Sequence, residues 1–407
     1  MKASLVAFIT LLPLLTIGSP TPEPKGIRIP LTKRSKLVDE DGIVSPRAAQ
    51  RELTRLTAKL QRGFAAFEKN TGAAHPLAFS MDLTKRATGT VPLTDEEGGA
   101  LWQGAISVGT PASTFTVDFD TGSSDLFLPG PNCQTNCQGH KIYNPGSSST
   151  SRDQGNTFSL AFGDGSTVQG EIFRDTVTVG GLTATNQAVG AATQYSTGFA
   201  LDEFPPDGLM GMAFPAISEF GANPVFQTLI AEGVVSSPVF GFRLAPSGSE
   251  LTLGFIPSVG TFTQLPVGNS GFWQVNLDSV NVNGAAAVSR LPSIVDTGTT
   301  LVVGDQNSVT RFYAAIPGAQ DASSEIGEGF FTFPCSSVPN VSMTFGGRAF
   351  SITNTFNLGR LSAGSTQCVG GVVYIPGINF WIAGDIFLQN VFASFDVGNL
   401  RVGFAAN

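Results

Sequence analysis

The sequence is poor in the residues on which several common hydrolase mechanisms depend. Its 407 residues include only two His and four Cys. It has no His-Glu-x-x-His motif, which excludes the usual helix-borne zinc site of metallopeptidases. His140 is the one His after residue 86, and no Gly-x-Ser-x-Gly motif places a serine beside it, so a Ser-His-Asp triad has little support.

Charged residues are also scarce, at 13%, whereas 48 Gly and 25 Pro favour many turns and short strands over long charged helices. The net charge of −8 argues against nucleic acid as a partner. Residues 1–86 contain 14 basic residues (Lys and Arg) and 7 acidic ones (Asp and Glu). Residues 87–407 contain 9 basic and 24 acidic residues. A basic N-terminal segment therefore precedes an acidic body, so the two parts attract each other or separate later.

Long hydrophobic runs are missing except at the N-terminus. After Lys2, an apolar run at residues 5–17 ends at small residues, which is typical of a signal peptide, and we assign residues 1–18 to it. No other stretch is long enough to span a membrane, and the C-terminus lacks the hydrophobic tail of a lipid-anchor signal. We therefore expect a secreted, extracellular protein with no membrane anchor, and a monomer is the default expectation.

The four cysteines allow three pairings. We expect Cys133 to pair with Cys137 and Cys335 with Cys368, because these two pairings close local loops. A four-Cys zinc site is the alternative, although the sequence has no Cys-x-x-Cys pair and a secreted chain favours disulfides.

One long amphipathic helix is expected over residues 45–69, where Ser45 can cap the start and Pro46 suits the first position. Apolar residues three and four positions apart form one face, and basic residues line much of the rest. The apolar residues are Leu53, Leu56, Leu60, Phe64 and Phe67, and the basic ones are Arg51, Arg55, Lys59 and Arg62. The helix is either solvated or docked on the acidic body, and the opposite charges favour docking.

The dibasic pair Lys85-Arg86 lies at the charge boundary, where a processing site is expected. We therefore assign residues 19–86 to a basic prosegment and expect Ala87 to begin the mature protein. Lys33-Arg34 is a second dibasic pair, so cleavage there stays open.

The body from about Leu101 onward is expected to be all-β, because residues 115–119 and 275–282 alternate with period two and helical patterns are few. It also repeats itself, since residues 117–124 resemble residues 293–300. Each copy is followed, at nearly the same interval, by an apolar-apolar-Gly unit. Such matched landmarks indicate two similar lobes, which we place at residues 87–258 and 259–407.

Asp-Thr-Gly occurs twice, beginning at Asp120 and Asp296, and each copy follows a strand-like apolar run. A lone copy is most simply an Asx-type turn, but two copies in a duplicated frame predict two loops that face each other across a cleft. Two carboxylates in close contact share one proton. The ionised member can then take a proton from water while the protonated one polarises a peptide carbonyl, with no metal and no cofactor.

At these residues the chain resembles the pepsin-like aspartic proteases, most closely the secreted fungal members. The resemblance covers about residues 100–407 and rests on residues 119–124, 295–300 and 381–385. It implies an all-β, bilobal fold with pseudo-twofold related lobes, a central active-site cleft, and Asp120 and Asp296 as the catalytic pair. It also implies substrate-binding positions beside that pair, at Gly122, Ser123, Gly298, Thr299 and Thr300.

The resemblance further implies a β-hairpin flap over residues 158–166. Its Gly163 and Asp164 would bond the substrate backbone, and Asp164 with Ser166 would accept a Lys side chain before the cut. The family usually has Tyr and Trp where this chain has Phe162 and Phe127, so a hydrogen bond between them is lost from both sides at once. Losing both partners can be nearly neutral, and we expect an apolar flap. Ala383 for the usual Leu is a smaller departure.

The segment at residues 26–34 resembles the strand that begins family prosegments. The family places a prosegment Lys against the catalytic carboxylates, and Lys33 and Lys69 are the candidates here. The resemblance thus implies an aspartic endopeptidase made as a zymogen, latent near neutral pH and active on proteins and peptides in acid. Its own prosegment and pepstatin-type compounds are the expected inhibitors.

Two other functions agree with part of the sequence. A non-catalytic binding protein on the same fold is one, supported only by Phe162. An all-β glycosidase with two carboxylates is the other, and the duplicated frame speaks against it. Separately, residues 340–342 form an N-glycosylation sequon at Asn340, and Ser342 is expected to share its outward strand face.

Overall fold

The computed structural model describes residues 27–34, 37–79, 101–161, 167–268 and 271–406. Several predicted features lie outside these residues. They are the signal peptide, Lys85-Arg86 with Ala87, and the flap residues Phe162, Gly163, Asp164 and Ser166. The described residues form 25 strands in four sheets and only five α-helices, so the expected all-β class is confirmed.

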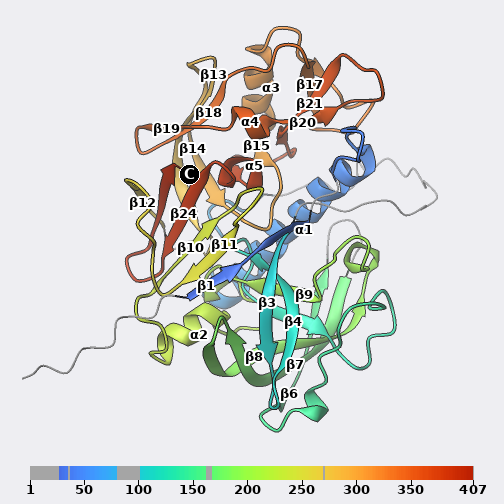
Figure 1. The fold of residues 1–407 in the computed structure, drawn as a ribbon, viewed down its shortest axis with the longest axis vertical. Coiled ribbons are helices and arrows are strands. Elements are labelled where there is room, and N and C mark those ends of the chain that lie inside the picture. Colours follow the sequence, from blue (N-terminus) through green and yellow to red (C-terminus); the bar gives the residue numbers. More distant parts are fainter. Residues whose placement is uncertain (1–26, 35–36, 80–100, 162–166, 269–270, 407) are drawn as a thin grey trace, which may run out of the picture.

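The first lobe, in the lower half of Figure 1, is built on an eight-stranded sheet. Its strands, in spatial order, are β2 (Thr32–Arg34), β3 (Leu101–Val108), β4 (Ser113–Asp120), β9 (Gly208–Gly211), β5 (Leu126–Pro129), β8 (Leu182–Tyr195), β7 (Thr167–Val179) and β6 (Arg152–Ala161). Strand β3 also pairs with β7, which curls the sheet back on itself.

The second lobe, in the upper half of Figure 1, contains a seven-stranded and a four-stranded sheet. The larger sheet runs β19 (Arg348–Ser351), β18 (Val341–Phe345), β13 (Gln274–Val282), β14 (Ala285–Val295), β23 (Trp381–Ala383), β15 (Val302–Gly304) and β22 (Val372–Tyr374). The smaller one runs β16 (Gln320–Asp321), β17 (Phe331–Pro334), β21 (Gln367–Gly370) and β20 (Asn357–Arg360).

The two lobes repeat one strand pattern, as the duplicated sequence frame predicts. In the first lobe β4 pairs in parallel with β9, β9 antiparallel with β5, and β5 in parallel with β8. In the second lobe β14, β23, β15 and β22 pair in the same order and directions. The bilobal fold with related lobes is therefore confirmed.

The glycine of each apolar-apolar-Gly unit lies where the chain has no room for a side chain. A Cβ on Gly211 would be 2.4 Å from the backbone nitrogen of Ser124, and one on Gly384 would be 2.3 Å from the backbone oxygen of Thr299. The loop after each Asp-Thr-Gly unit thus packs directly on this glycine, which explains why the two motifs recur together.

A six-stranded sheet joins the lobes. It runs β1 (Ile27–Pro30), β11 (Glu250–Leu253), β10 (Val239–Arg243), β24 (Val391–Asp396), β25 (Arg401–Ala406) and β12 (Thr263–Pro266). Its outermost strand β1 comes from the basic N-terminal segment, as does β2 at the edge of the first-lobe sheet. One hydrophobic core runs through both lobes and includes side chains of this segment.

The long helix α1 (Pro46–Thr71) begins and ends as its sequence predicts. The Ser45 side chain accepts a hydrogen bond from the Ala48 backbone N–H, and Gly72 ends the helix in the left-handed conformation, at φ 74°. Figure 1 shows α1 lying between the two lobes, so the docked interpretation is correct and the solvated one is wrong. The other helices are α2 (Val225–Ala231), α3 (Gln306–Ala314), α4 (Thr353–Phe356) and α5 (Asp385–Leu388).

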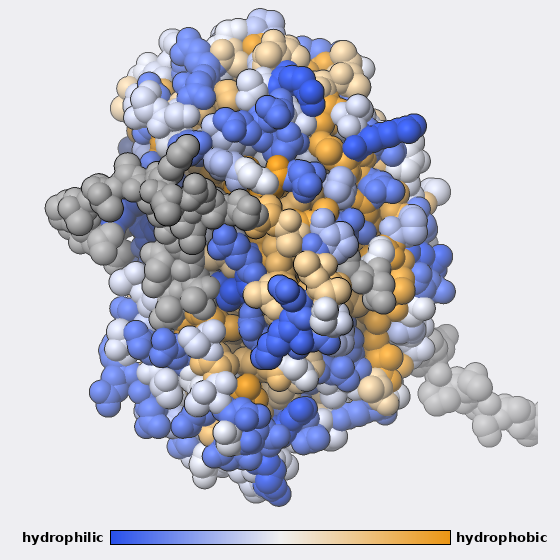
Figure 2. All heavy atoms as spheres, turned by 180° about the vertical axis from the view of Figure 1, so that it is seen from behind, coloured by the Kyte–Doolittle hydropathy of each residue, from blue (hydrophilic) through white to orange (hydrophobic). Residues whose placement is uncertain are grey.

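Both expected disulfides are present. Cys133 is bonded to Cys137 in the loop after β5, and Cys335 to Cys368 of β21. Seen from behind, hydrophilic residues cover most of both ends, and apolar residues reach the surface mainly along the middle (Figure 2). None of the helices in the described ranges is long and apolar enough to cross a membrane.

Candidate active site

The two Asp-Thr-Gly units form loops directly after β4 and β14, and each loop hydrogen-bonds its own aspartate. In both loops one carboxylate oxygen accepts the backbone N–H two residues on, and the other accepts the hydroxyl three residues on. For Asp120 the donors are Gly122 N at 2.8 Å and Ser123 Oγ at 2.6 Å; for Asp296 they are Gly298 N at 3.0 Å and Thr299 Oγ1 at 2.5 Å.

The middle threonines of the two units lock the loops together. The backbone N–H of Thr121 donates to Oγ1 of Thr297 at 3.0 Å, and the reverse bond has the same length. Each hydroxyl then donates to a backbone carbonyl of the opposite lobe, at Val295 and Phe119. Both threonines are fully buried, so the geometry of the site is fixed by the junction of the two lobes.

The glycine of each unit lies against the aspartate of the other. A Cβ on Gly122 would be 2.5 Å from Oδ1 of Asp296, and a Cβ on Gly298 would be 2.3 Å from Oδ1 of Asp120. The two carboxyl groups therefore face each other. Only glycine leaves room for this approach.

Burial and mutual charge separate the protonation of the two aspartates, each of which is 1% exposed. Burial, opposed in part by the Lys59 charge, together with the charge of Asp120 raises the pKa of Asp296. Burial acts in the same direction on Asp120, but the Lys59 charge and hydrogen bonds from Asp296, Ser123 and Gly122 outweigh it and lower the pKa of Asp120. The pair therefore holds one proton and one negative charge over a wide pH range.

Lys59 of α1 lies between the two aspartates. Its Nζ is 3.1 Å from Oδ1 of Asp120 and 2.6 Å from Oδ2 of Asp296. The expectation of Lys33 or Lys69 at this place is therefore wrong. Lys69 bonds the Glu219 carbonyl near the end of α1, and the backbone of Lys33 pairs with Trp102 in β3. Among the basic residues of α1 only Lys59 is buried, and Arg51, Arg55 and Arg62 are half-buried. The division of the helix into an apolar and a basic face does not indicate which basic residue reaches the dyad.

Helix α1 covers the rest of the site as well. Oε1 of Glu52 accepts the backbone N–H of Thr300 at 2.9 Å. Gly63 lies against the Phe272 ring, since a Cβ there would be 2.4 Å from it. Between α1 and the first lobe a cavity is lined by basic side chains of the helix and acidic side chains of the body, namely Arg55, Lys59, Arg62, Asp118, Asp120, Asp125 and Glu219.

Two buried acids hold the surrounding structure. Asp385 ends one of the motifs that carry the family resemblance, whereas the sequence does not indicate a role for Asp125. Asp125 accepts the Ser218 hydroxyl at 2.6 Å and the Glu219 backbone N–H at 2.7 Å, and burial raises the pKa of Asp125 to about 6. Asp385, directly after the second apolar-apolar-Gly unit, accepts the Trp102 indole N–H at 2.7 Å and so links the second lobe to β3.

Two further predicted positions are Phe127, which lines the same cavity as Asp120, and the sequon at Asn340. Phe127 is buried, and its ring centroid is 6.0 Å from that of Tyr195 and 5.7 Å from that of Phe199, so apolar packing surrounds it. Asn340 is exposed just before β18, and within β18 Ser342 is half-buried between the buried Val341 and Met343. Residues 340–343 therefore alternate between outward-facing and buried positions, as expected for the sequon.

Known proteins match most of this chain. The family model described as eukaryotic aspartyl protease matches residues 102–407. An aspartic protease of Phaffia rhodozyma is 46% identical over 331 residues, which cover 79% of this chain and 80% of the relative. Aspergillopepsin-1 of Aspergillus clavatus is 33% identical over 405 residues, 97% of this chain and 96% of the relative. Cathepsin D of Dictyostelium discoideum is 37% identical over 336 residues, 78% of this chain and 85% of the relative.

Proposed function

The chain belongs to the eukaryotic aspartyl protease family and is an aspartic-type endopeptidase, and from this we propose that Asp120 and Asp296 are its catalytic pair. They hydrolyse peptide bonds of proteins in acid by activating a water molecule, without a cofactor. The observation that carries the proposal is the approach of two buried carboxyl groups, each backed by the glycine of the opposite loop.

The reaction follows from a pair that holds one proton. The ionised carboxylate takes a proton from water as the water oxygen attacks the peptide carbonyl carbon, and the protonated carboxyl gives its proton to the carbonyl oxygen. The resulting tetrahedral diol breaks its C–N bond. The amine leaves with a proton from one carboxyl, and the other carboxylate takes a proton from a diol hydroxyl. The pair then again holds one proton.

Substrate would bind along the cleft that α1 occupies in the precursor. We assign the backbone contacts of the peptide to the loop residues Gly122, Ser123, Gly298, Thr299 and Thr300, and to the flap residues Phe162, Gly163, Asp164 and Ser166. The Glu52 contact with Thr300 N supports this assignment, because a carboxylate of α1 takes a backbone donor that an extended peptide carbonyl would use.

The basic N-terminal segment would make the chain a secreted zymogen. Residues 1–18 would be the signal peptide and residues 19–86 a prosegment removed at Lys85-Arg86, leaving a monomer of two lobes at residues 87–258 and 259–407. Lys59 between the two aspartates supports latency, because it takes the place of water and substrate. The match to aspergillopepsin-1 over 97% of the chain supports it too, since it extends into this segment. Asn340 would carry an N-linked glycan.

The test is digestion of haemoglobin or casein at pH 3–4 by the acid-treated protein, with and without pepstatin. We expect digestion that pepstatin stops, and Asp120→Asn or Asp296→Asn lowers the rate roughly a thousandfold, the range of a lost acid–base group. Thermal unfolding of each variant checks that it is folded. Proteolysis that survives either substitution in a folded protein contradicts the assignment.

A further inference from the structure

The basic residues of α1 reach beyond the two aspartates. Arg51, Arg55 and Lys59 follow each other at intervals of one helical turn, and only Lys59 contacts the dyad. Arg51 forms an ion pair with Glu203, and Arg55 lies against residues 199–204. Two arginines of the precursor are thus held by one stretch of the first lobe.

This stretch is built to hold a guanidinium group. After the short turn Thr197–Phe199, the backbone N–H groups of Glu203 and Phe204 both donate to the Ala200 carbonyl, at 2.9 and 2.8 Å. The Arg55 guanidinium carbon lies 5.2 Å from the ring centroid of Phe199 and 5.1 Å from that of Phe204. Guanidinium groups stack well on aromatic rings.

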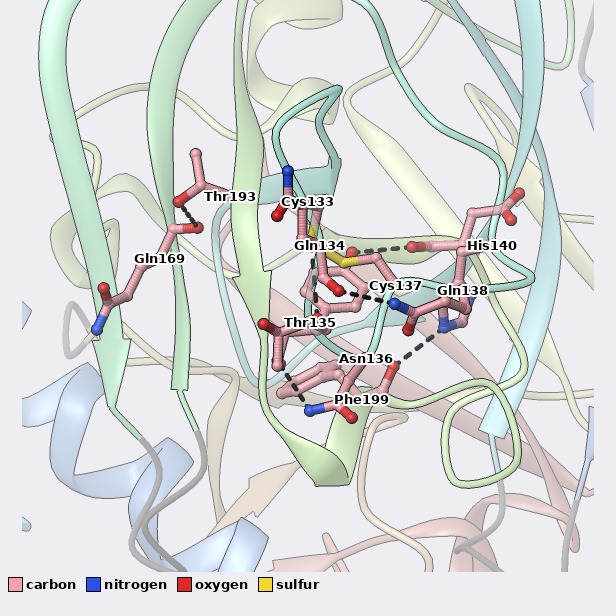
Figure 3. Close-up of a disulfide and its surroundings, with 12 residues drawn as sticks. Cys133, Gln134, Thr135, Asn136, Cys137, Gln138, His140, Gln169, Thr193 and Phe199 are labelled. Atoms are coloured by element: carbon pink, nitrogen blue, oxygen red, sulfur yellow. Dashed lines mark hydrogen bonds between the residues drawn. A yellow bond between two sulfur atoms is a disulfide. The ribbon is translucent and has the colours of Figure 1, made fainter.

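The stretch is also held rigidly from behind. In Figure 3 the His140 ring reaches the backbone of Phe199, where Nε2–H donates to the carbonyl at 3.0 Å. Asn136, inside the Cys133–Cys137 loop, donates to the Tyr195 carbonyl at 3.0 Å. Phe199 and Phe204 are 1% and 0% exposed, so their positions are set by the core of the first lobe and not by α1 alone.

Asp118 adds a second acid beside Arg55. It is fully buried on β4, two residues before Asp120, and it lines the same cavity as Arg55. No side chain in the described part of the molecule donates a hydrogen bond to either of its carboxylate oxygens. Burial and the Asp120 charge raise the pKa of Asp118 to about 8, and the positive charge of Arg55 acts in the opposite direction. We name Asp118, Phe199, Glu203 and Phe204 the arginine slot.

The arginine slot loses its occupants when the prosegment leaves, while its residues stay in the enzyme. We propose that it then serves as a specificity subsite, which binds an arginine side chain of the substrate two to four residues from the scissile bond. The proposal rests on the endopeptidase function proposed above. Along α1, Arg55 and Arg51 lie about 6 and 12 Å from Lys59, at about 1.5 Å per residue. An extended peptide covers these distances in about two to four residues, at about 3.3 Å each.

The first experiment needs no variant. Acid-activated wild-type protein is given peptides that differ at one position, which carries Arg, its neutral isostere citrulline, or Lys, at each of the second to fourth residues on both sides of the cut. At pH 5 we expect the pepstatin-sensitive kcat/KM for Arg to exceed that for citrulline about tenfold at one position, the effect of one charge-assisted hydrogen bond. Lys should gain less, because it lacks the planar guanidinium group that packs against the two rings. Equal kcat/KM values for Arg and citrulline at every position overturn the proposal.

The second experiment assigns the preference to the slot. Glu203→Gln is expected to bring the Arg-to-citrulline ratio close to one, and Glu171→Gln, at an exposed residue of β7, is expected to leave the ratio unchanged. A ratio that survives Glu203→Gln overturns the slot alone, since cleavage itself continues. Absence of pepstatin-sensitive cleavage of every peptide overturns the endopeptidase proposal, and the slot falls with it.

Discussion

At the scale of single residues, the site depends on space as much as on charge. Asp120 and Asp296 have equivalent hydrogen-bond donors in their own loops. What brings them together is the missing side chain at Gly122 and Gly298, because each glycine borders the carboxylate of the other lobe. The two carboxyl groups can share one proton because glycine at both positions lets them approach each other.

Gly298→Ala tests this directly. Its Cβ would lie 2.3 Å from Oδ1 of Asp120 and must displace that carboxylate. Since a shift of about 1 Å at a reacting group can cost about 100-fold, we expect kcat on a peptide substrate to fall at least about 100-fold. Gly268→Ala is the matched control, because its Cβ would meet no atom within 4 Å. Near-normal kcat in a folded Gly298→Ala protein would contradict the close approach.

The sequence predicts the two aspartates and their neighbours but not the residues that join the lobes. Thr121 and Thr297 belong to the recognised motifs, yet their bonds to each other and across the junction require the lobes to be placed. The Trp102 bond to Asp385 joins residues 283 positions apart, and no local pattern indicates such a pair. Lys59 was missed because several basic residues of one helix are equivalent until their partners are known.

At the scale of elements, α1 is buried on two faces for different reasons. Its apolar face enters the core, with Leu56 and Leu60 at 2% and 1% exposure. Its basic face meets acids of the body, and at Lys59 this contact is also buried, with 8% of the residue exposed. Burial lowers the pKa of Lys59, but the charges of Asp120 and Asp296 raise it by a larger amount. The pKa of Lys59 is therefore raised overall.

Lys59→Met measures how much of the latency this contact supplies. Methionine keeps the length and removes the charge, and breaking a buried ion pair from one side costs roughly 3 kcal/mol. We expect α1 to dock more weakly, so the precursor processes itself at a pH where the wild type stays intact, as followed by mass spectrometry. Lys69→Met on the same helix, where the side chain is exposed, should leave the onset pH unchanged. An unchanged onset in Lys59→Met would show that Lys59 does not control release.

Individual strands follow from local patterns, whereas the sheets do not. Strand β4 at Ser113–Asp120 and β13 at Gln274–Val282 lie where the alternation places them. The pairing of β1 with β11 joins residues more than 200 positions apart, and the sheet between the lobes contains strands from three distant parts of the chain. Such pairings depend on the whole fold, so sequence periodicity predicts strands but not their neighbours.

At the scale of the whole molecule, a basic segment is folded into an acidic body, and we expect pH to control its release. Several buried acids have a raised pKa while α1 is docked, about 8 for Asp118 and about 6 for Asp125, mainly because of burial. While α1 is docked, these groups therefore take up protons at a higher pH than Asp120 does. Their protonation cannot be what releases α1 in stronger acid.

Asp120 sets the expected pH of release. Its pKa is lowered in the docked state, so docking gains stability above the ordinary Asp pKa of about 3.9 and loses it as pH falls below that value. We expect release and processing to begin below about pH 4 when the precursor is incubated at pH 6, 5, 4, 3 and 2 and sampled by mass. Complete processing at pH 6 would contradict this order of titration.

If the N-terminal segment is removed as proposed, the precursor has two short strands, β1 and β2, that the processed enzyme lacks. Each covers the outer strand of a sheet, β11 or β3, and their removal uncovers rows of backbone N–H and C=O groups that invite aggregation. In the proposed zymogen, the native body would then be assembled on a segment that is later removed, and the processed enzyme would persist because it unfolds slowly. After denaturation and dilution, the precursor should recover its native state while the processed enzyme does not.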